Sequence, residues 1–284
     1  MTVVGGIEAG GTKWLCAVGT GPGELAATET IPTTTPVETI GRAIAFFERE
    51  GPVRAVGIGS FGPVDLRPGS PTWGSITTTP KPGWADTDVA GAVGGKLGVP
   101  VAFDTDVNAA ALGEHRWGTA VGLDTFCYVT VGTGIGGGAI AGGSIVHGLL
   151  HPEFGHMRIP HDLDVDPFPG SCPFHGDCWE GLAAGPAIEA RWGRPPRELR
   201  AEESVWRLEA RYVALGLVNV VSVLSPERVV LGGGVMDVPG LLGLVRGEVD
   251  TLLAGYTATE IVPPALGPLS GVLGAIALAL SARP

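Results

Sequence analysis

VVGGIEAGGTKWLCAV, residues 3–18, holds two runs of strand-forming residues on either side of a glycine-rich turn. Residues 3–7 form the first run, residues 14–18 form the second, and Gly10-Gly11-Thr12 lies between them. β-Branched and aromatic residues favour strands, and glycine permits the tight turns that join them. The stretch therefore predicts a β-hairpin at the start of an α/β unit.

The same order of elements recurs in the second half of the chain. Residues 126–131 form a strand-like run that leads into a second glycine-rich turn, residues 132–138, and residues 139–145 are the expected hairpin partner. Apolar periodicity places further elements after each hairpin. The expected strands are 53–58, 99–103 and 228–231, and the expected helices are 38–49, 108–117, 186–192, 203–224 and 271–280. This recurrence predicts two related α/β domains with a cleft between them.

The composition argues against several classes of protein. The 284 residues carry a formal net charge of −11, and the chain has no basic run of the kind on which nucleic-acid binding relies. Its N-terminal residues lack the pattern of a signal peptide, and the apolar residues 271–280 are too few to span a bilayer core of roughly 30 Å. We therefore expect a cytoplasmic protein with no nucleic-acid or membrane partner, whose four cysteines are thiols or metal ligands.

Three glycine-rich turns follow strand-like runs and indicate nucleotide binding. The first is Gly10-Gly11-Thr12-Lys13, preceded by Glu8, whose carboxylate could hold Mg²⁺. The second begins with Gly132-Thr133-Gly134, and the third is Gly232-Gly233-Gly234, which could lie against a base or ribose. Small residues let backbone N–H groups approach phosphates. The alternative for each is an ordinary tight turn, and Glu8 would then be a solvated hairpin charge.

Asp104-Thr105-Asp106 follows an expected strand, at the edge where α/β folds carry their chemistry. A kinase needs a carboxylate that accepts the proton of the attacking hydroxyl. Asp106 is the candidate base. The alternative is that Asp106 or Thr105 only caps the helix that follows.

His156, Cys172, His175 and Cys178 have the spacing of a metal site within a loop-like region, residues 151–178. Two thiolates and two imidazoles form the tetrahedral donor set that Zn²⁺ prefers. Because all four positions come from protein, the predicted zinc is structural. The alternative is a mobile loop with incidental His and Cys residues, whereas Cys16 and Cys127 lie in apolar strands and are expected core residues.

The predicted zinc loop would also bring together groups able to bind a sugar. Glu153 precedes His156 by three residues, and Glu180 follows Cys178 by two. Carboxylates make strong hydrogen bonds to hydroxyl groups, and His156 could bind zinc through one ring nitrogen and a sugar through the other. Both glutamates could equally be exposed loop charges. Trp73 and Trp84 could line a sugar site, but core or interface positions are favoured for them.

These motifs resemble those of the ROK family of sugar kinases and repressors, within the hexokinase–actin fold group, and are most similar to bacterial ROK fructokinases. The resemblance spans essentially the whole chain. It is carried by residues 5–13 (GGIEAGGTK), 59–65 (GSFGPVD), 104–114 (DTDVNAAALGE), 132–138 (GTGIGGG), 151–156 (HPEFGH), 172–181 (CPFHGDCWEG) and 231–235 (LGGGV).

The resemblance implies a fold and a set of residue roles. The fold would comprise two related ribonuclease-H-like, actin-like ATPase domains with an active-site cleft, residues 1–117 plus 270–284 and residues 118–269. Asp106 would be the general base. The implied sugar contacts are Gly62, Pro63, Thr105, Asp106, Glu153, His156 and Glu180, and the implied ATP contacts are Gly10, Gly11, Thr12, Lys13, Gly132, Thr133, Gly134, Pro186, Gly232, Gly233 and Gly234.

The function that follows is phosphorylation of fructose to fructose 6-phosphate, with ATP as co-substrate, Mg²⁺ near Glu8, structural Zn²⁺ and a homodimeric assembly. Glucose, mannose or another hexose is the alternative substrate, and a non-catalytic sugar sensor is the alternative class. Many ROK kinases have Asp where this chain has Glu8, and many have Cys where it has His175; both variants suit the fructokinase branch. Because the chain starts at its first strand, without the helix-turn-helix of ROK repressors, DNA binding is disfavoured.

Overall fold

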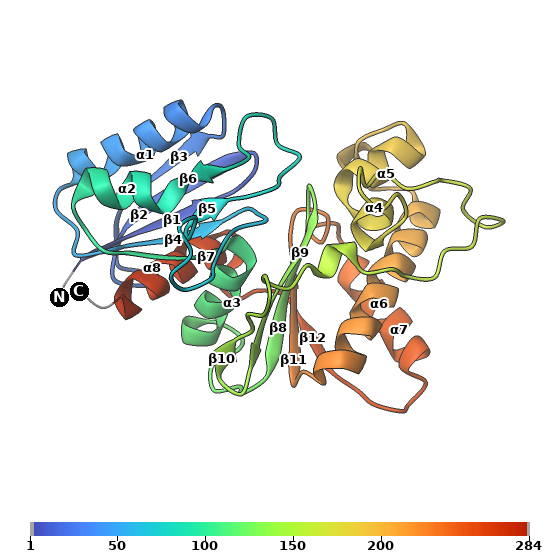
Figure 1. Cartoon of the computed structure of the whole chain (residues 1–284). Coiled ribbons are helices and arrows are strands. Elements are labelled where there is room, and N and C mark those ends of the chain that lie inside the picture. Colours follow the sequence, from blue (N-terminus) through green and yellow to red (C-terminus); the bar gives the residue numbers. More distant parts are fainter. Residues whose placement is uncertain (1–2, 283–284) are drawn as a thin grey trace.

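The computed structural model describes residues 3–282, which fold around two five-stranded sheets (Figure 1). The strands of the first sheet are β1 (Val4–Ala9), β2 (Lys13–Gly19), β3 (Leu25–Pro32), β4 (Val56–Ser60) and β7 (Val101–Thr105). Those of the second are β8 (Phe126–Val131), β9 (Ile135–Ala141), β10 (Ser144–Ile145), β11 (Arg228–Gly232) and β12 (Glu260–Val262). The short strands β5 (Ser75–Ile76) and β6 (Thr87–Asp88) form a separate pair.

Both large sheets have the same topology. The strand orders are β3-β2-β1-β4-β7 and β10-β9-β8-β11-β12. In each sheet the first three strands are antiparallel and the last two add in parallel. The repeated hairpin in the sequence therefore corresponds to two α/β halves of one design, and the predicted fold class is confirmed.

Helices cover the sheets and join them. They are α1 (Pro36–Glu50), α2 (Val89–Leu97), α3 (Asp106–Trp117), α4 (Trp179–Ala183), α5 (Gly185–Trp192), α6 (Glu203–Leu224), α7 (Leu241–Leu253) and α8 (Ser270–Ser281). Short 3₁₀ turns occur at η1 (Phe154–His156), η2 (Pro196–Glu198) and η3 (Gly267–Leu269). No helix within residues 3–282 is long and apolar enough to cross a membrane.

Local chemistry explains where helix α1 begins and which face it buries. Thr35 caps its N-terminus by accepting from the amide of Glu38, and Pro36 supplies the first helical residue. Phe46 and Phe47 are buried on the inner face of the helix. A side chain at Gly5 of β1 would contact the Phe47 ring at 2.6 Å, so the glycine allows helix and strand to pack closely.

Helices α3 and α8 lie between the two sheets (Figure 1, green and red). Helix α8 comes from the end of the chain, yet it packs against β1 and β4 of the first sheet and against α3. Small residues permit this contact. A Cβ at Gly57 would overlap the carbonyl of Ala275, and a Cβ at Gly274 would overlap the carbonyl of Ala109.

The second hairpin differs from its prediction. Its return strand begins at Ile135 rather than at residue 139, so only residues 132–134 form the turn. The glycines at 136–138 lie within the strand because other groups occupy the space of their side chains: a Cβ at Gly137 would overlap the ring of Phe154, and one at Gly138 would lie 2.5 Å from the carbonyl oxygen of Val107. The glycine run thus reflects close packing as well as turn formation.

Candidate active site

A cavity of about 560 Å³ lies between the two halves of the chain. The first half contributes Glu8, Lys13 and Asp106 to its walls, and the second half contributes Tyr128 and the turn at residues 232–234. Three of the predicted site segments, which are far apart in the sequence, thus meet at one cavity. The cavity also has a third wall, residues 263–271, for which the sequence offered no motif.

Asp106 is the first residue of α3, directly after β7. Thr105 is the cap of the helix, because its hydroxyl accepts from the amide of Asn108 at 3.1 Å. The carboxyl of Asp106 accepts from the amide of Val107 at 2.9 Å and lines the cavity. Burial raises the pKa of Asp106 to about 6, which is near the range in which a carboxylate works as a general base at neutral pH.

Glu8 lies near the end of β1, on the same cavity as Asp106. Burial and the negative charge of Asp106 raise the pKa of Glu8 to about 7, against the opposing effect of Lys13. A buried carboxyl group whose ionisation is opposed by a neighbouring carboxylate forms a site in which a divalent cation fits. Gly271 of α8 makes room for this carboxyl, because a Cβ there would overlap it.

Of the first two glycine turns, only Lys13 lines the cavity, whereas residues 10–12 and 132–134 do not. Gly10-Gly11-Thr12 joins β1 to β2 and is closed by a hydrogen bond from the Gly10 amide to the carbonyl of Lys13, at 3.0 Å. Gly132-Thr133-Gly134 joins β8 to β9. The amide of Gly185, at the start of α5 beside Pro186, donates to the carbonyl of Gly132 at 2.7 Å, so the turn and the helix N-terminus lie together.

The third turn lines the cavity directly. Gly233 has φ of +98°, and a Cβ there would overlap the carbonyl of Val131, so glycine is needed to bring the turn close to β8. Another part of the lining is formed by residues that sequence reasoning missed: Pro263, Pro264, Gly267, Pro268, Ser270 and Gly271. Their only signal was a Pro-Pro pair and a Gly-Pro pair just before the last expected helix.

Glu153 and Glu180 converge near Asp106, although they come from separate segments. Glu180 lies in the first turn of α4, and its carboxylate accepts from the amide of Ile135 at 2.8 Å. Burial and the charges of Glu180 and Asp106 raise the pKa of Glu153 to about 7. The carboxyl group of Glu153 therefore lies within electrostatic range of both Glu180 and Asp106. Gly62 and Pro63 follow β4, with Gly62 beside His151.

His156, Cys172, His175 and Cys178 form a compact cluster with the geometry of a metal site. Their four ligand atoms all lie within 4.8 Å of one another. The Nδ1 atom of His156 lies 3.8 and 3.7 Å from the two cysteine sulfurs and 3.3 Å from Nδ1 of His175. A tetrahedral zinc ion with ordinary bond lengths would separate its ligand atoms by roughly 3.3–3.8 Å. The donor set therefore fits zinc in both chemistry and spacing.

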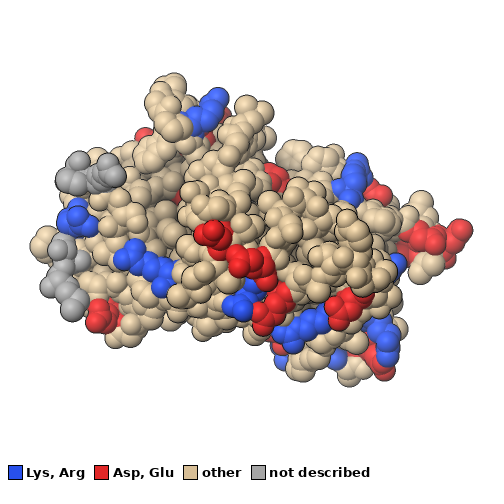
Figure 2. All heavy atoms as spheres, turned by 90° about the horizontal axis from the view of Figure 1, so that it is seen from below, with Lys and Arg blue, Asp and Glu red and all other residues tan. Residues whose placement is uncertain are grey.

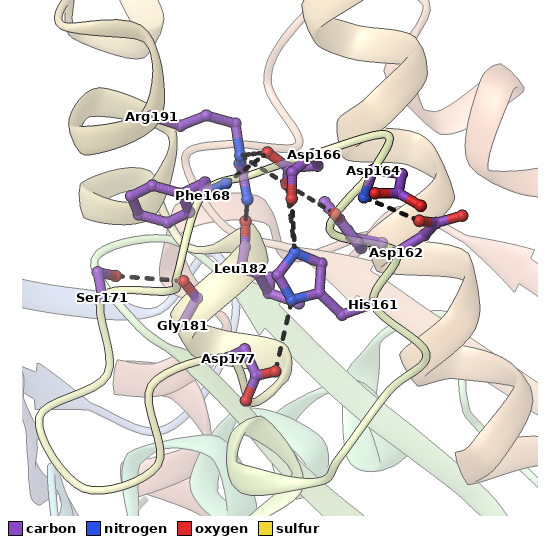
Figure 3. A network of polar contacts seen from close by, with 11 residues as sticks. His161, Asp162, Asp164, Asp166, Phe168, Ser171, Asp177, Gly181, Leu182 and Arg191 are labelled. Carbon is purple, nitrogen blue, oxygen red and sulfur yellow. Dashed lines mark hydrogen bonds and ion pairs between the residues drawn. The ribbon is translucent and has the colours of Figure 1, made fainter.

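A buried polar network holds the segment that carries this cluster (Figure 3). Asp166 accepts from the guanidinium of Arg191 on α5 at 3.0 Å. It also accepts from the hydroxyl of Tyr212 on α6 at 2.7 Å. His161 links the carbonyl of Asp166 to the carboxylate of Asp177, which stands between two cluster residues. The network ties the metal-site loop to two helices of the second half.

The remaining predictions concern the aromatic side chains, the core thiols and the surface. Trp84 is fully buried and donates to the carbonyl of Thr34, which favours a core role for it. Cys16 and Cys127 are fully buried, as expected for core residues. On the face shown in Figure 2, basic and acidic side chains are interspersed and form no continuous basic patch.

Comparison with known proteins identifies the family. The profile of the ROK family matches residues 4–282. A fructokinase of Zymomonas mobilis is 45% identical over 99% of this chain and 97% of its own length, and a fructokinase of Pediococcus pentosaceus is 42% identical over 99% and 98%. A ROK family glucokinase from Streptomyces griseus, solved in complex with glucose and AMPPNP, superposes with a TM-score of 0.82 at 28% identity, covering 99% of this chain and all of the other. The chain therefore belongs to the ROK family.

Proposed function

We propose that this protein is a fructokinase that transfers the γ-phosphoryl group of ATP to the 6-hydroxyl of fructose. The observation that carries the proposal is the position of Asp106 at the junction of two sites. It lines the interdomain cavity with Glu8 and also lies within electrostatic reach of Glu153. Identity of 42–45% to two fructokinases over nearly the whole chain supports fructose as the substrate.

Asp106 acts as the general base. Its carboxylate takes the proton of the 6-hydroxyl while that oxygen attacks the γ-phosphorus and ADP leaves on the opposite side. The pKa of about 6 leaves most of the group ionised at neutral pH yet keeps it basic enough to accept the proton. Thr105 fixes the start of α3 and thereby the position of the base.

The nucleotide occupies the interdomain cavity in this proposal. Glu8 would hold Mg²⁺, which when bound neutralises phosphate charge and polarises the transferred group. Backbone amides of the glycine turns hold the phosphates, and the third turn lies against the adenosine. The proposed ATP contacts are Gly10, Gly11, Thr12, Lys13, Gly132, Thr133, Gly134, Pro186, Gly232, Gly233 and Gly234.

The sugar lies on the other side of Asp106. Glu153, His156 and Glu180 would accept or donate hydrogen bonds to its hydroxyl groups, and Gly62, Pro63 and Thr105 would border it from the first half. Zinc held by His156, Cys172, His175 and Cys178 has a structural role, because four protein ligands leave no open position for a substrate. Its function is to fix the loop that presents the sugar-binding groups.

We further propose how the chain is divided and assembled. Residues 1–117 with 270–284 would form one domain and residues 118–269 the other, a division supported by the packing of α8 on the first sheet. The protein would be a homodimer. Light scattering coupled to size exclusion tests the assembly, and a monomer at micromolar concentration would contradict it.

The experiment that tests the function is a hexose panel. ADP release is measured with fructose, glucose, mannose and N-acetylated hexosamines in the presence of Mg-ATP, and fructose should have the highest kcat/KM. Asp106→Asn should lower kcat by about 10²–10⁴-fold while circular dichroism stays unchanged. Asp88→Asn, at the cap of α2, is the matched control. The proposal fails if no hexose is phosphorylated or if Asp106→Asn retains normal turnover.

A further inference from the structure

His151 lies between Val64 of the first half and Glu153, one of the proposed sugar contacts of the second half. The side chain is 5% exposed. Its Nε2 atom accepts the backbone N–H of Val64, at 3.2 Å, in the loop that follows β4. Its Nδ1 atom lies 3.4 Å from a carboxylate oxygen of Glu153 and 3.5 Å from the carbonyl of Pro152. One buried ring thus touches a backbone group of the first half and an acidic group of the second.

The partners of His151 determine where its proton lies. A backbone N–H can only donate, so Nε2 must be the acceptor of the ring. In a neutral imidazole the proton is then on Nδ1, and the groups that face Nδ1 are both acceptors. Burial lowers the pKa of His151, which is consistent with a neutral ring. The chain of donors therefore runs from Val64 through the ring toward Glu153.

The loop that contains His151 has a second anchor on the first half. His147 lies 2.9 Å from the carboxylate of Asp104, and Asp104 also accepts from the amide of Thr105 and from the side chain of Asn108. These partners surround Asp106 in sequence. The loop between β10 and η1 is thus anchored to the first half at two points, by His147 on Asp104 at the end of β7 and by His151 on Val64 after β4.

We propose that His151 is a positioning residue, whose Nδ1–H orients the carboxylate of Glu153 toward the sugar while Nε2 ties it to the Val64 amide. The inference rests on the proposed function, in which Glu153 contacts the hexose. Without the ring, Glu153 would remain attached to the loop but would rotate away from the direction in which it meets a hydroxyl group. The expected result is weaker sugar binding with little change in nucleotide binding.

Two substitutions test the contacts of the two ring nitrogens separately. In His151→Gln the amide oxygen can reach the position of Nε2 and keep the bond to Val64, but no donor remains toward Glu153. In His151→Asn the amide NH₂ can take the place of Nδ1 and keep that donor. Losing a donor that faces a charged group at 3.4 Å costs up to about 1.5 kcal/mol, so fructose KM should rise by up to about tenfold in His151→Gln and less in His151→Asn.

Control measurements distinguish a loss of Glu153 orientation from a general loss of structure. Both variants should keep one zinc per chain, an unchanged Tm within a few degrees and an ATP KM within twofold of wild type. His115→Gln is the matched control, because His115 lies on α3, contacts the carbonyl of Leu123 and stacks on Phe126 away from the crevice. It should leave fructose KM unchanged.

The tautomer provides a readout independent of catalysis. Long-range ¹H–¹⁵N correlation on histidine-labelled protein, with His151→Gln for assignment, should show the Nδ1–H form of His151 at neutral pH. An Nε2–H form or a charged ring overturns the inference. So does an active wild type in which His151→Gln retains its fructose KM, or in which His151→Asn is no better than His151→Gln. A wild type that phosphorylates no hexose instead overturns the proposed function.

Discussion

At Asp104-Thr105-Asp106, the two roles that the motif allowed belong to two different residues. The sequence offered either a base or a helix cap at Asp104-Thr105-Asp106. The structure gives the cap to Thr105, and Asp106 is left facing the cavity. Its place after a β-strand made it identifiable in advance. Its burial, which raises its pKa, results from the second half folding over it and could not be read from local sequence.

The pH dependence of the reaction should report this burial. Because the folded-state pKa of Asp106 is raised to about 6, the ionised base is present above that pH and is lost as the pH falls through it. We expect kcat at saturating fructose, a condition that removes the contribution of sugar binding by Glu153, to fall about tenfold per pH unit below about pH 6 and to be level above it. The profile is measured at saturating Mg²⁺, which keeps Glu8 ionised.

The Asp106→Asn enzyme is the control for that profile. Its residual activity should lack the acid limb, because amide nitrogen and oxygen do not titrate in this range. An acid limb of unchanged position in the variant would assign the titration to another group.

At the scale of elements, glycines decide how closely α3 and α8 approach. Gly274 lies against the carbonyl of Ala109 with no room for a side chain, whereas Gly243 on the exposed side of α7 has no neighbour within 4 Å. We expect Gly274→Ala to lower the free energy of unfolding by about 1–3 kcal/mol. Gly243→Ala should raise it by about 0.5–1 kcal/mol. Denaturant titration measures both, and equal effects would contradict the packing argument.

The metal-site loop is the second element whose role can be tested. Cys172→Ser should remove zinc, measured by elemental analysis, and raise fructose KM at least about tenfold, because the loop would no longer hold Glu153 and Glu180 in place. Binding of an ATP analogue should persist, since none of the four cluster residues lines the nucleotide cavity. Cys16→Ala removes a core thiol outside the cluster and should keep the metal. Zinc retention by Cys172→Ser would count against the assignment.

For the whole molecule, Glu114 sits where the chain passes between its two halves. It is fully buried at the end of α3. Its carboxylate accepts from the amide of Thr119 in one crossing segment, and from the amide of Leu266 and the hydroxyl of Ser270 in the other. A single side chain therefore fastens both connections between the two halves.

Replacing Glu114 tests this arrangement. Glu114→Gln puts an amide donor against backbone donors, and we expect a loss of about 1–3 kcal/mol in the free energy of unfolding with a weaker sugar-induced change in radius of gyration by X-ray scattering. Glu227→Gln, on an exposed carboxylate that also accepts two backbone amides, should lose less and leave the scattering change intact. A Glu114→Gln protein of wild-type stability would refute the prediction.

How much of the molecule could be foreseen depended on the range of the interactions. The two hairpins, α3, α6 and the clustering of the four His and Cys residues were predicted from local patterns, and Asp106 stays the predicted base. Strand β3, helices α2 and α7, and the cavity wall at residues 263–271 were not. Strand β3 lies at an edge, and its residues alternate between partly buried and exposed positions without an apolar run. The wall forms only when α8 returns to the first sheet. Contacts between distant segments leave weak local signatures.

The return of α8 also has a consequence for biosynthesis. When the ribosome has produced the first 260 residues, strands β1 and β4 exist but the helix that covers them does not. Their apolar surface must then wait, in contact with solvent or a chaperone, while the whole second half is translated. Ile276 and its buried neighbours on α8 would complete the domain only at the last step, so a premature stop before residue 270 should yield an aggregation-prone polypeptide.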